Sequence, residues 1–257
     1  MQPYLIDSHC HLYLAEYEND IDDILKRAEE QGVTKFYLPA IDSSELLNLL
    51  RLSDRYPDKC FPMMGLHPCY VKDNYQQEMD IVRQQLSERK FAAIGEIGLD
   101  YYWDTEFKDQ QQEVFHQQIE LALRNNLPVV IHSRNATAEA IDIVANHQDG
   151  TLKGIFHCFS GTIEEAARII ELGFLLGIGG VVTYKNAGLA ELVKEISLEH
   201  IVLETDSPYL SPVPFRGKRN ESSNLQYIVQ KIADIKQVNV AEVAAITSRN
   251  SELLFAN

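Results

Sequence analysis

The sequence predicts an α/β fold, a (β/α)8 barrel with an additional C-terminal helix, from three observations. Short apolar runs alternate with amphipathic stretches along the chain. Dividing the 257 residues among eight strand–helix units gives about 32 residues each (257/8), close to the roughly 30 residues of such a unit. Six of the apolar runs lead directly into histidine or acidic residues, and only a closed ring of parallel strands brings six strand ends together.

The expected strands are short and apolar throughout, which is typical of parallel strands buried on both faces. Six runs cover 5–6, 61–66, 91–95, 128–131, 154–156 and 201–203, and they lead into His9 and His11, His67, Glu96, His132, His157, and Asp206 in that order. Two further runs, 35–38 and 174–178, complete a set of eight. An open sheet gathers ligands chiefly at one switch point, so this distribution favours a barrel.

The expected helices have apolar residues at three- and four-residue spacing, as helices that cover a sheet do. They span 20–30, 43–56, 77–86, 107–125, 138–147, 162–172 and 187–196, followed by the C-terminal pair 224–237 and 239–255. Ser43, Thr162 and Asn239 are expected N-caps, and Gly32 and Gly173 are expected to end helices in the left-handed conformation. No linker-like stretch divides the chain, so a single domain over residues 1–257 is expected.

Charge and composition limit the classes of function. The formal net charge of -15 argues against broad electrostatic binding to DNA or to an anionic membrane, because phosphate contacts require lysine and arginine. The sequence contains neither a signal-peptide pattern nor an apolar run of the ~20 residues that span a bilayer. The four cysteines lack C-x-x-C spacing, so neither a zinc knuckle nor a disulfide framework is indicated. A cytoplasmic enzyme without a membrane or obligate protein partner is expected.

The histidine and acidic residues at the strand ends predict a metal centre. Gathering them without compensation would be costly, and a divalent metal ion removes that cost. His9 and His11 are one residue apart, so both side chains point to the same side of an extended segment. Mixed imidazole and carboxylate donors suit Zn²⁺, Mn²⁺, Fe²⁺ or Co²⁺ better than Mg²⁺.

Two ions are expected rather than one, because three protein ligands normally suffice for a catalytic site. Glu96 is the natural bridging carboxylate; His9, His11 and Asp206 complete one site, and His132 and His157 the other. Asp206 is expected to steer the attacking water, with Glu204 orienting it from behind.

Two interpretations stay open near the Glu96 strand. Asp100 is either a solvated loop acid or a residue that orients a ligand. The aromatic residues Tyr101, Tyr102 and Trp103 either stack on a nucleobase or pack against the protein.

Seven motifs, in order along the chain, resemble the TatD family of metal-dependent hydrolases, a branch of the amidohydrolase superfamily. They are Asp7-Ser8-His9-Cys10-His11, Gly65-Leu66-His67-Pro68, Gly95-Glu96-Ile97-Gly98-Leu99-Asp100, His132-Ser133-Arg134, His157-Cys158-Phe159-Ser160-Gly161, Glu204-Thr205-Asp206-Ser207-Pro208-Tyr209-Leu210 and Arg216-Gly217-Lys218-Arg219-Asn220. The resemblance implies a TIM barrel, two divalent metal ions and Mg²⁺-stimulated deoxyribonuclease activity in the 3′ to 5′ direction.

The resemblance also assigns roles to individual residues. It implies metal ligation by His9, His11, Glu96, His132, His157 and Asp206, places His67 close to the phosphate of the substrate, and implies that Arg216, Lys218 and Arg219 position the substrate. Glu96, Asp206 and Glu204 are the expected catalytic residues, and Arg134 is also expected to bind substrate. One position departs from the family pattern, because Ser222 replaces a proline. The loop before the penultimate helix is therefore expected to be less rigid.

The leading hypothesis is phosphodiester hydrolysis by a metal-activated water, with two divalent ions (Zn²⁺, Mn²⁺ or Mg²⁺) as cofactors. An acidic enzyme should favour an accessible 3′ DNA end or a short oligonucleotide over a long duplex. The alternative is hydrolysis of an amide, ester or lactone, as elsewhere in the superfamily. Many such relatives bridge their ions with a modified lysine, whereas Glu96 holds that position here. A metal-binding protein without activity is a third possibility.

Overall fold

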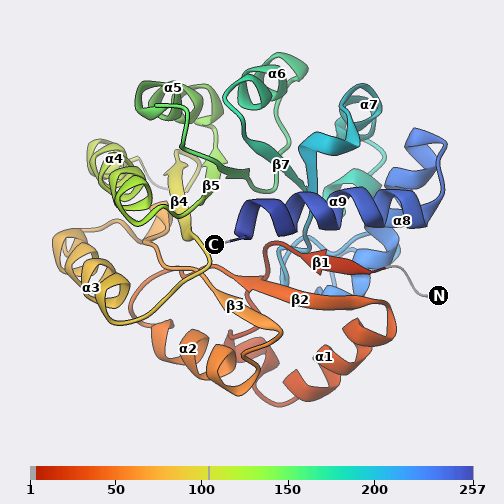
Figure 1. Ribbon diagram of the computed structural model, residues 1–257, viewed down its shortest axis with the longest axis horizontal. Helices are drawn as coiled ribbons and strands as arrows, with labels where there is room; N and C mark the ends of the chain where they lie inside the picture. The colour runs from red at the N-terminus through yellow and green to blue at the C-terminus, as the bar shows by residue number, and fades with distance from the viewer. Residues whose placement is uncertain (1–3, 104, 257) are drawn as a thin grey trace.

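The computed structural model describes residues 4–103 and 105–256, in which eight parallel strands alternate with helices (Figure 1). The strands are β1 (Leu5–Asp7), β2 (Val33–Leu38), β3 (Cys60–Pro62), β4 (Ile94–Asp100), β5 (Val129–Arg134), β6 (Gly154–Phe156), β7 (Leu175–Ile178) and β8 (Ile201–Leu203). Hydrogen bonding orders them as β1-β2-β3 and β4-β5-β6-β7-β8. Each strand therefore pairs with its neighbours in sequence.

Contacts at both seams join these two sheets into one ring. Between β3 and β4, Met64 forms a parallel bridge with Ile94, and the Gly95 amide donates to the Met64 carbonyl at 3.0 Å. Between β1 and β8, the Ser8 amide donates to the Leu203 carbonyl at 3.0 Å. The predicted (β/α)8 barrel is confirmed.

Nine α-helices occur in the described residues, and seven of them cover the outside of the ring between successive strands (Figure 1). They are α1 (Ile21–Glu30), α2 (Leu46–Arg55), α3 (Tyr75–Glu88), α4 (Lys108–Asn125), α5 (Thr137–His147), α6 (Ile163–Glu171), α7 (Leu189–Glu195), α8 (Leu225–Lys236) and α9 (Val240–Phe255). The eighth helix, α8, follows β8, so α9 is the predicted additional helix. It crosses the barrel opening in Figure 1.

Most of the expected helix boundaries are confirmed. Thr162 forms a capping box at the start of α6, in which its hydroxyl accepts from the Glu165 amide at 3.1 Å. At the start of α9, the Asn239 Oδ1 atom accepts from the Glu242 amide at 2.8 Å. Gly32 and Gly173 have φ values of 84° and 81°, a left-handed conformation that glycine adopts without steric cost.

The expectation that Ser43 caps α2 is wrong. The helix begins at Leu46, three residues later, after a residue that forms no side-chain cap. The Ser43 hydroxyl instead donates to Glu78 at 2.9 Å, and its amide donates to the same carboxylate. The capping oxygen is thus used in a contact with α3 that the local sequence does not reveal.

Two predicted strand ends also need correction. Glu96 and His132 lie inside β4 and β5 instead of after them, because the ladder between these strands continues to the Asp100–Arg134 pair. The register of that ladder shifts between Gly95 and Ile97, around Glu96. Conversely, β3 stops at Pro62, well before His67.

Burial agrees with the parallel-sheet interpretation, since every residue of β1, β4, β6 and β8 is buried. One apolar cluster fills the barrel from its amino-terminal end, where Leu254 and Phe255 of α9 join Ile6, Tyr37 and Val202. The larger cluster lies between the strands and the outer helices. In the part of the chain that the structure describes, no helix has both the length and the hydropathy of a transmembrane segment.

Candidate metal centre

Glu96 lies at the middle of the candidate site, with one carboxylate oxygen facing each of two groups of histidines. Its Oε2 lies 3.2 Å from His9 Nε2 and 3.6 Å from His11 Nε2. Its Oε1 lies 3.0 Å from His132 Nδ1 and 2.9 Å from His157 Nε2. The arrangement is that of a carboxylate placed to bridge two ions.

Two pairs of imidazole nitrogens have a separation that suits a shared ion. His9 Nε2 and His11 Nε2 are 3.3 Å apart, and so are His132 Nδ1 and His157 Nε2. Two imidazole nitrogens that bind one Zn²⁺ tetrahedrally, at about 2.0–2.1 Å each, lie roughly 3.3 Å apart. The donor set therefore fits a divalent ion at each pair.

Asp206 completes the first donor group. Its Oδ1 lies 3.7 Å from His9 Nε2 and 3.5 Å from His11 Nε2. The ligand atoms of these three residues all lie within 4.8 Å of one another, as do those of His9, Glu96 and His157. Asp206 retains 14% side-chain exposure, so this carboxylate is the member of the group that faces the barrel opening.

Hydrogen bonds on the far ring nitrogens fix two tautomers. The Tyr13 hydroxyl donates to the Pro39 carbonyl, so His11 Nδ1, 3.1 Å away, must donate to Tyr13. His132 Nε2 lies 2.8 Å from Asp100 Oδ2 and donates to it. In its neutral form each ring therefore directs an unprotonated nitrogen toward the donor groups, as a histidine ligand requires.

His67 differs from His11 and His132 in that it directs its protonated nitrogen toward the site. Its Nδ1 accepts from the Cys69 amide at 3.0 Å, and burial lowers the pKa of His67, so the neutral ring carries its proton on Nε2. This N–H points at Glu96 Oε1, 3.1 Å away. Although His67 Nε2 lies close to Glu96 and His132, the ring is arranged as a hydrogen-bond donor rather than as a ligand.

The charges of the central groups depend on each other. Burial favours the neutral form of Glu96, but the surrounding histidines hold the pKa of Glu96 well below its usual range. Burial likewise opposes protonation of His157, yet Glu96 and Glu204 raise the pKa of His157 well above its usual range. The protein therefore stabilises positive charge beside a buried carboxylate, which is the charge pattern that a cation would satisfy.

Glu204 lies on the side of the His157 ring that faces away from Glu96. It is fully buried, its Oε1 accepts from the Cys158 amide at 2.6 Å, and it lies 3.6 Å from His157 Nδ1. A Cβ atom on Gly177 would lie 2.3 Å from Glu204 Oε2, so only glycine fits there. His157 Nδ1 and Glu204 Oε2 are buried without a hydrogen-bond partner among the described residues.

Asp7 connects the first and last strands beneath the site. Its Oδ1 accepts from the Thr205 amide at 3.0 Å, and its Oδ2 accepts from the hydroxyls of Thr205 and Ser222 at 2.6 Å each. The Asp206 amide donates to the His9 carbonyl at 2.9 Å. This network holds two candidate ligands, His9 and Asp206, in a fixed relation.

Ser222, which stands where the family pattern has proline, has a hydrogen-bonding role that the sequence does not indicate. It is fully buried and starts a short 3-10 helix, Ser222–Asn224. A proline would restrict the φ angle at this position, whereas the Ser222 hydroxyl donates a hydrogen bond to Asp7. Burial raises the pKa of Asp7 to about 7, although these hydrogen bonds lower it.

The basic residues expected to bind substrate lie outside the group of donor residues. Arg134 ends β5 and its guanidinium lies over the Tyr102 ring. Both other residues are in the loop after β8. Arg216 lies over the ring of Tyr184, which follows β7, and Lys218 lies over the ring of Phe215. The neighbouring Arg219 forms an ion pair with Asp20 at 2.5 Å, so it has a structural partner.

Sequence reasoning missed two residues of the site. Tyr13, which fixes the tautomer of His11, could have been found because it follows His11 by two residues and so points to the same side of an extended segment. Asp7 belongs to the first motif, but its partners Thr205 and Ser222 are almost 200 or more residues away in the chain. No local pattern indicates that pairing.

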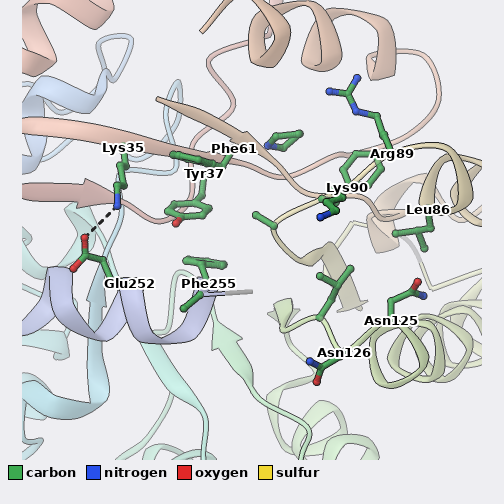
Figure 2. Close-up of a pocket in the computed structure, with 15 residues that line it drawn as sticks. Lys35, Tyr37, Phe61, Leu86, Arg89, Lys90, Asn125, Asn126, Glu252 and Phe255 are labelled. Carbon is green, nitrogen blue, oxygen red and sulfur yellow. Dashed lines mark hydrogen bonds and ion pairs between the residues drawn. The ribbon is translucent and has the colours of Figure 1, made fainter. Parts of the chain in front are cut away.

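A cavity of about 750 Å³ lies at the opposite, amino-terminal end of the barrel. Figure 2 shows Lys35 beside Glu252 on α9, and Tyr37 facing Phe255. No histidine lines this cavity, and its single acidic residue, Glu252, pairs with Lys35 at 3.1 Å. Among the described residues, this cavity therefore lacks the donors of a metal centre. It is larger than a second cavity, of about 560 Å³, which lies beside Ser133 and Arg134 at the end of β5.

A barrel that gathers imidazole and carboxylate donors at the carboxyl ends of its strands defines a TIM-barrel metal-dependent hydrolase. The family described as TatD related DNase matches residues 6–256, and the chain belongs to this family. The chain is 38% identical over 252 residues to the metal-dependent hydrolase YabD of Bacillus subtilis, with 98% of each chain covered. It is 36% identical to the hydrolase YcfH of Escherichia coli over 98% of this chain and 96% of YcfH.

Solved structures agree with this assignment. The crystal structure of YjjV, a TatD homologue from Escherichia coli, matches the whole of both chains with a TM-score of 0.94 and 28% identity. A lactonase from Listeria monocytogenes matches with a TM-score of 0.63 and 12% identity, over 95% of this chain and 92% of the lactonase. That second likeness shows the fold alone.

Proposed function

We propose that this hydrolase is a deoxyribonuclease that cleaves phosphodiester bonds at an accessible 3′ DNA end or in a short oligonucleotide. The observation that carries the proposal is the position of Glu96, with one oxygen toward each pair of histidine nitrogens 3.3 Å apart. This geometry supports two divalent ions, Zn²⁺, Mn²⁺ or Mg²⁺. The name of the matching family, TatD related DNase, supports DNA as the substrate.

The proposed ligands are His9, His11 and Asp206 for one ion and His132 and His157 for the other, with Glu96 shared. When bound, the ions would lower the pKa of a water molecule and neutralise charge on the phosphate. Asp100 and Glu204 act on His132 and His157 from behind and position those rings. Glu204 is too deeply buried to touch a substrate, so its role is positioning.

Asp206 and His67 are the groups that act on the reacting atoms. The Asp206 carboxylate faces the opening, and its pKa stays low because His11 offsets the effect of burial. It is therefore ionised at neutral pH and can accept a proton from the attacking water. The His67 Nε2–H can donate to a nonbridging phosphate oxygen, which would replace its contact with Glu96.

The charge of the protein supports a short substrate. At a net charge of -15, a long phosphate track would be repelled. Arg216 and Lys218, in the loop after β8, are proposed to hold a phosphate further along the strand. The absence of C-x-x-C spacing among the four cysteines is consistent with a cytoplasmic enzyme.

The experiment uses metal-loaded enzyme and a 5′-labelled single-stranded oligonucleotide, with products identified by mass spectrometry. Release of mononucleotides in order from the 3′ end is expected, and a 3′-phosphorothioate linkage should slow the first step. A panel of amides, esters and lactones tests the alternative class of substrate. Turnover of that panel without any cleavage of DNA would overturn the proposal.

A further inference from the structure

Three side chains form an exposed cluster beside the metal centre, here called the aromatic shelf: Tyr102, Trp103 and Arg134. Tyr102 and Trp103 are 53% and 68% exposed, and their rings meet edge to face with centroids 5.0 Å apart. The Arg134 guanidinium lies 3.7 Å from the Tyr102 centroid and 5.2 Å from that of Trp103. Arg134 forms no ion pair with any residue in the ranges 4–103 and 105–256.

The neighbouring Tyr101 has a different environment, which separates it from the shelf. It is partly buried, with Lys108 4.4 Å from its ring centroid. Its hydroxyl accepts from Gln112 at 3.1 Å. Of the three aromatic residues in this loop, Tyr101 therefore packs against the protein, while Tyr102 and Trp103 face solvent.

The shelf is attached to the metal centre through Asp100. One oxygen of Asp100 accepts from the backbone amides of Tyr102 and Trp103, at 2.9 and 3.1 Å. The other accepts from His132 Nε2 at 2.8 Å. The same carboxylate thus orients a proposed ligand and fixes the backbone of the shelf, so the distance between the two is set by the fold.

Arg134 also borders a polar cavity of about 560 Å³. Its other lining residues include the polar Ser133, Asn135, Thr137 and Ser160. Two acidic residues also line it: Glu139, which pairs with Lys108 at 3.5 Å, and Glu165, which accepts from the Thr162 amide at 2.8 Å. The cavity lies between the ends of β5 and β6, the strands that carry or lead into His132 and His157. A phosphate in this cavity would thus lie within reach of Arg134 and beside the metal centre.

We propose that the aromatic shelf stacks the terminal nucleobase of a bound DNA strand, while Arg134 holds the phosphate next to the scissile one. This inference rests on the proposed deoxyribonuclease function. Stacking is tolerant of sequence because every base has a π face, and an arginine can stack and bind phosphate at once. It also gives an acidic protein a means of binding DNA that does not depend on many phosphate contacts.

Trp103 is the single tryptophan of the chain, so tryptophan fluorescence, excited at a wavelength that the 12 tyrosines do not absorb, reports on the shelf alone. Metal-loaded enzyme is titrated with a short oligothymidylate whose linkages are phosphorothioates, to slow hydrolysis. An oligonucleotide of the same length with abasic sites at its three 3′-terminal positions is the matched control. We expect saturable quenching with the first and little with the second. Equal quenching by both would overturn the stacking role.

Kinetics on the cleavable oligonucleotide test the same point independently. Trp103→Ala should raise KM about tenfold or more, with kcat changed by less than about twofold, and Trp103→Phe should restore most of the affinity. Neither change should affect the KM for the abasic oligonucleotide. Arg134→Ala should raise KM for both oligonucleotides, because it removes a phosphate contact. Leu253→Ala, at an exposed apolar residue on α9, is the control and should change nothing.

The outcomes separate the shelf from the proposed function. If wild-type enzyme cleaves DNA but Trp103→Ala keeps its KM and the titration shows no quenching, the shelf is not a base-binding site and the nuclease proposal stands. If wild-type enzyme neither cleaves nor binds DNA, the proposed function fails and the shelf proposal fails with it.

Discussion

The two ends of the barrel are built from the same eight strands but differ in how completely their polar groups are satisfied. At the carboxyl end, buried imidazoles and carboxylates converge, and His9 Nδ1, His157 Nδ1 and Glu204 Oε2 lack hydrogen-bond partners among the described residues; one further such atom, Thr34 Oγ1, lies near the start of β2. At the amino end, Tyr37 stacks on Phe255 at 3.8 Å and Lys35 pairs with Glu252. Buried polar atoms without partners are thus concentrated at the carboxyl end, where active sites of this fold lie, whereas ring stacking and an ion pair hold α9 against the amino end.

The most direct way to test this contrast is to change one carboxylate at each end. Glu96→Gln keeps the shape of the side chain but removes the negative charge of the proposed bridging carboxylate. Activity should fall by at least about 10²- to 10³-fold, comparable to the loss of one group that stabilises charge in the transition state. Bound metal, measured by elemental analysis, should also decrease.

The matched control is Glu252→Gln, in which the same chemical change is made at the amino end. It removes one exposed ion pair, and such pairs contribute little to the free energy of unfolding. Activity and metal content should therefore stay at wild-type levels. Nuclease activity that survives in Glu96→Gln would contradict the central role assigned to this carboxylate.

Phe255→Ala should have the converse effect. It removes a buried ring that stacks on Tyr37 at the end of α9, and such truncations destabilise by about 3–5 kcal/mol. Urea denaturation should show this loss, while kcat per folded molecule stays unchanged. Leu253→Ala, on the same helix but 63% exposed, should leave the free energy of unfolding almost unaltered. A loss of kcat without a loss of stability would show that the amino end has a catalytic role.

Asp100→Asn tests a residue that positions a ligand at the carboxyl end. Asp100 accepts from His132 and from the shelf amides, and these contacts hold the pKa of Asp100 below its usual range despite burial. Loss of such a partner typically lowers metal affinity or activity about 10- to 100-fold. Metal affinity, measured by competition with a chelator, should fall within that range. Asp149→Asn, at an exposed loop, should not change it, and equal affinities would remove Asp100 from the site.

The sequence predicted which imidazole and carboxylate side chains the fold brings together better than it predicted their surroundings. His9, His11, Glu96 and Asp206 were found because each interrupts or follows an apolar run, a local signal. The bond from Ser43 to Glu78 was missed because it depends on how two helices pack. The choice between stacking and packing for Tyr102 also required the structure, since it depends on a guanidinium 32 residues further along the chain.

Substitutions of Ser222 should have the smallest effect on stability among these variants. They test how the strand ends at the carboxyl end of the barrel are held together. Its hydroxyl donates to buried Asp7, which also binds Thr205 next to Asp206. Ser222→Ala leaves that carboxylate with one bond fewer, at a cost of about 1–2 kcal/mol of stability. Ser222→Pro restores the residue of the family pattern and regains part of this by restricting the unfolded chain.

Urea denaturation of the three proteins should therefore give the order wild type, Ser222→Pro, Ser222→Ala, with kcat reduced less than about tenfold in either variant. Ser223→Ala is the neighbouring control, because its hydroxyl donates to Glu221 instead of Asp7. If Ser222→Ala were as stable as wild type, the hydrogen bond to Asp7 would contribute nothing. The strand ends that carry His9 and Asp206 would then be held by Thr205 and the backbone bond between them.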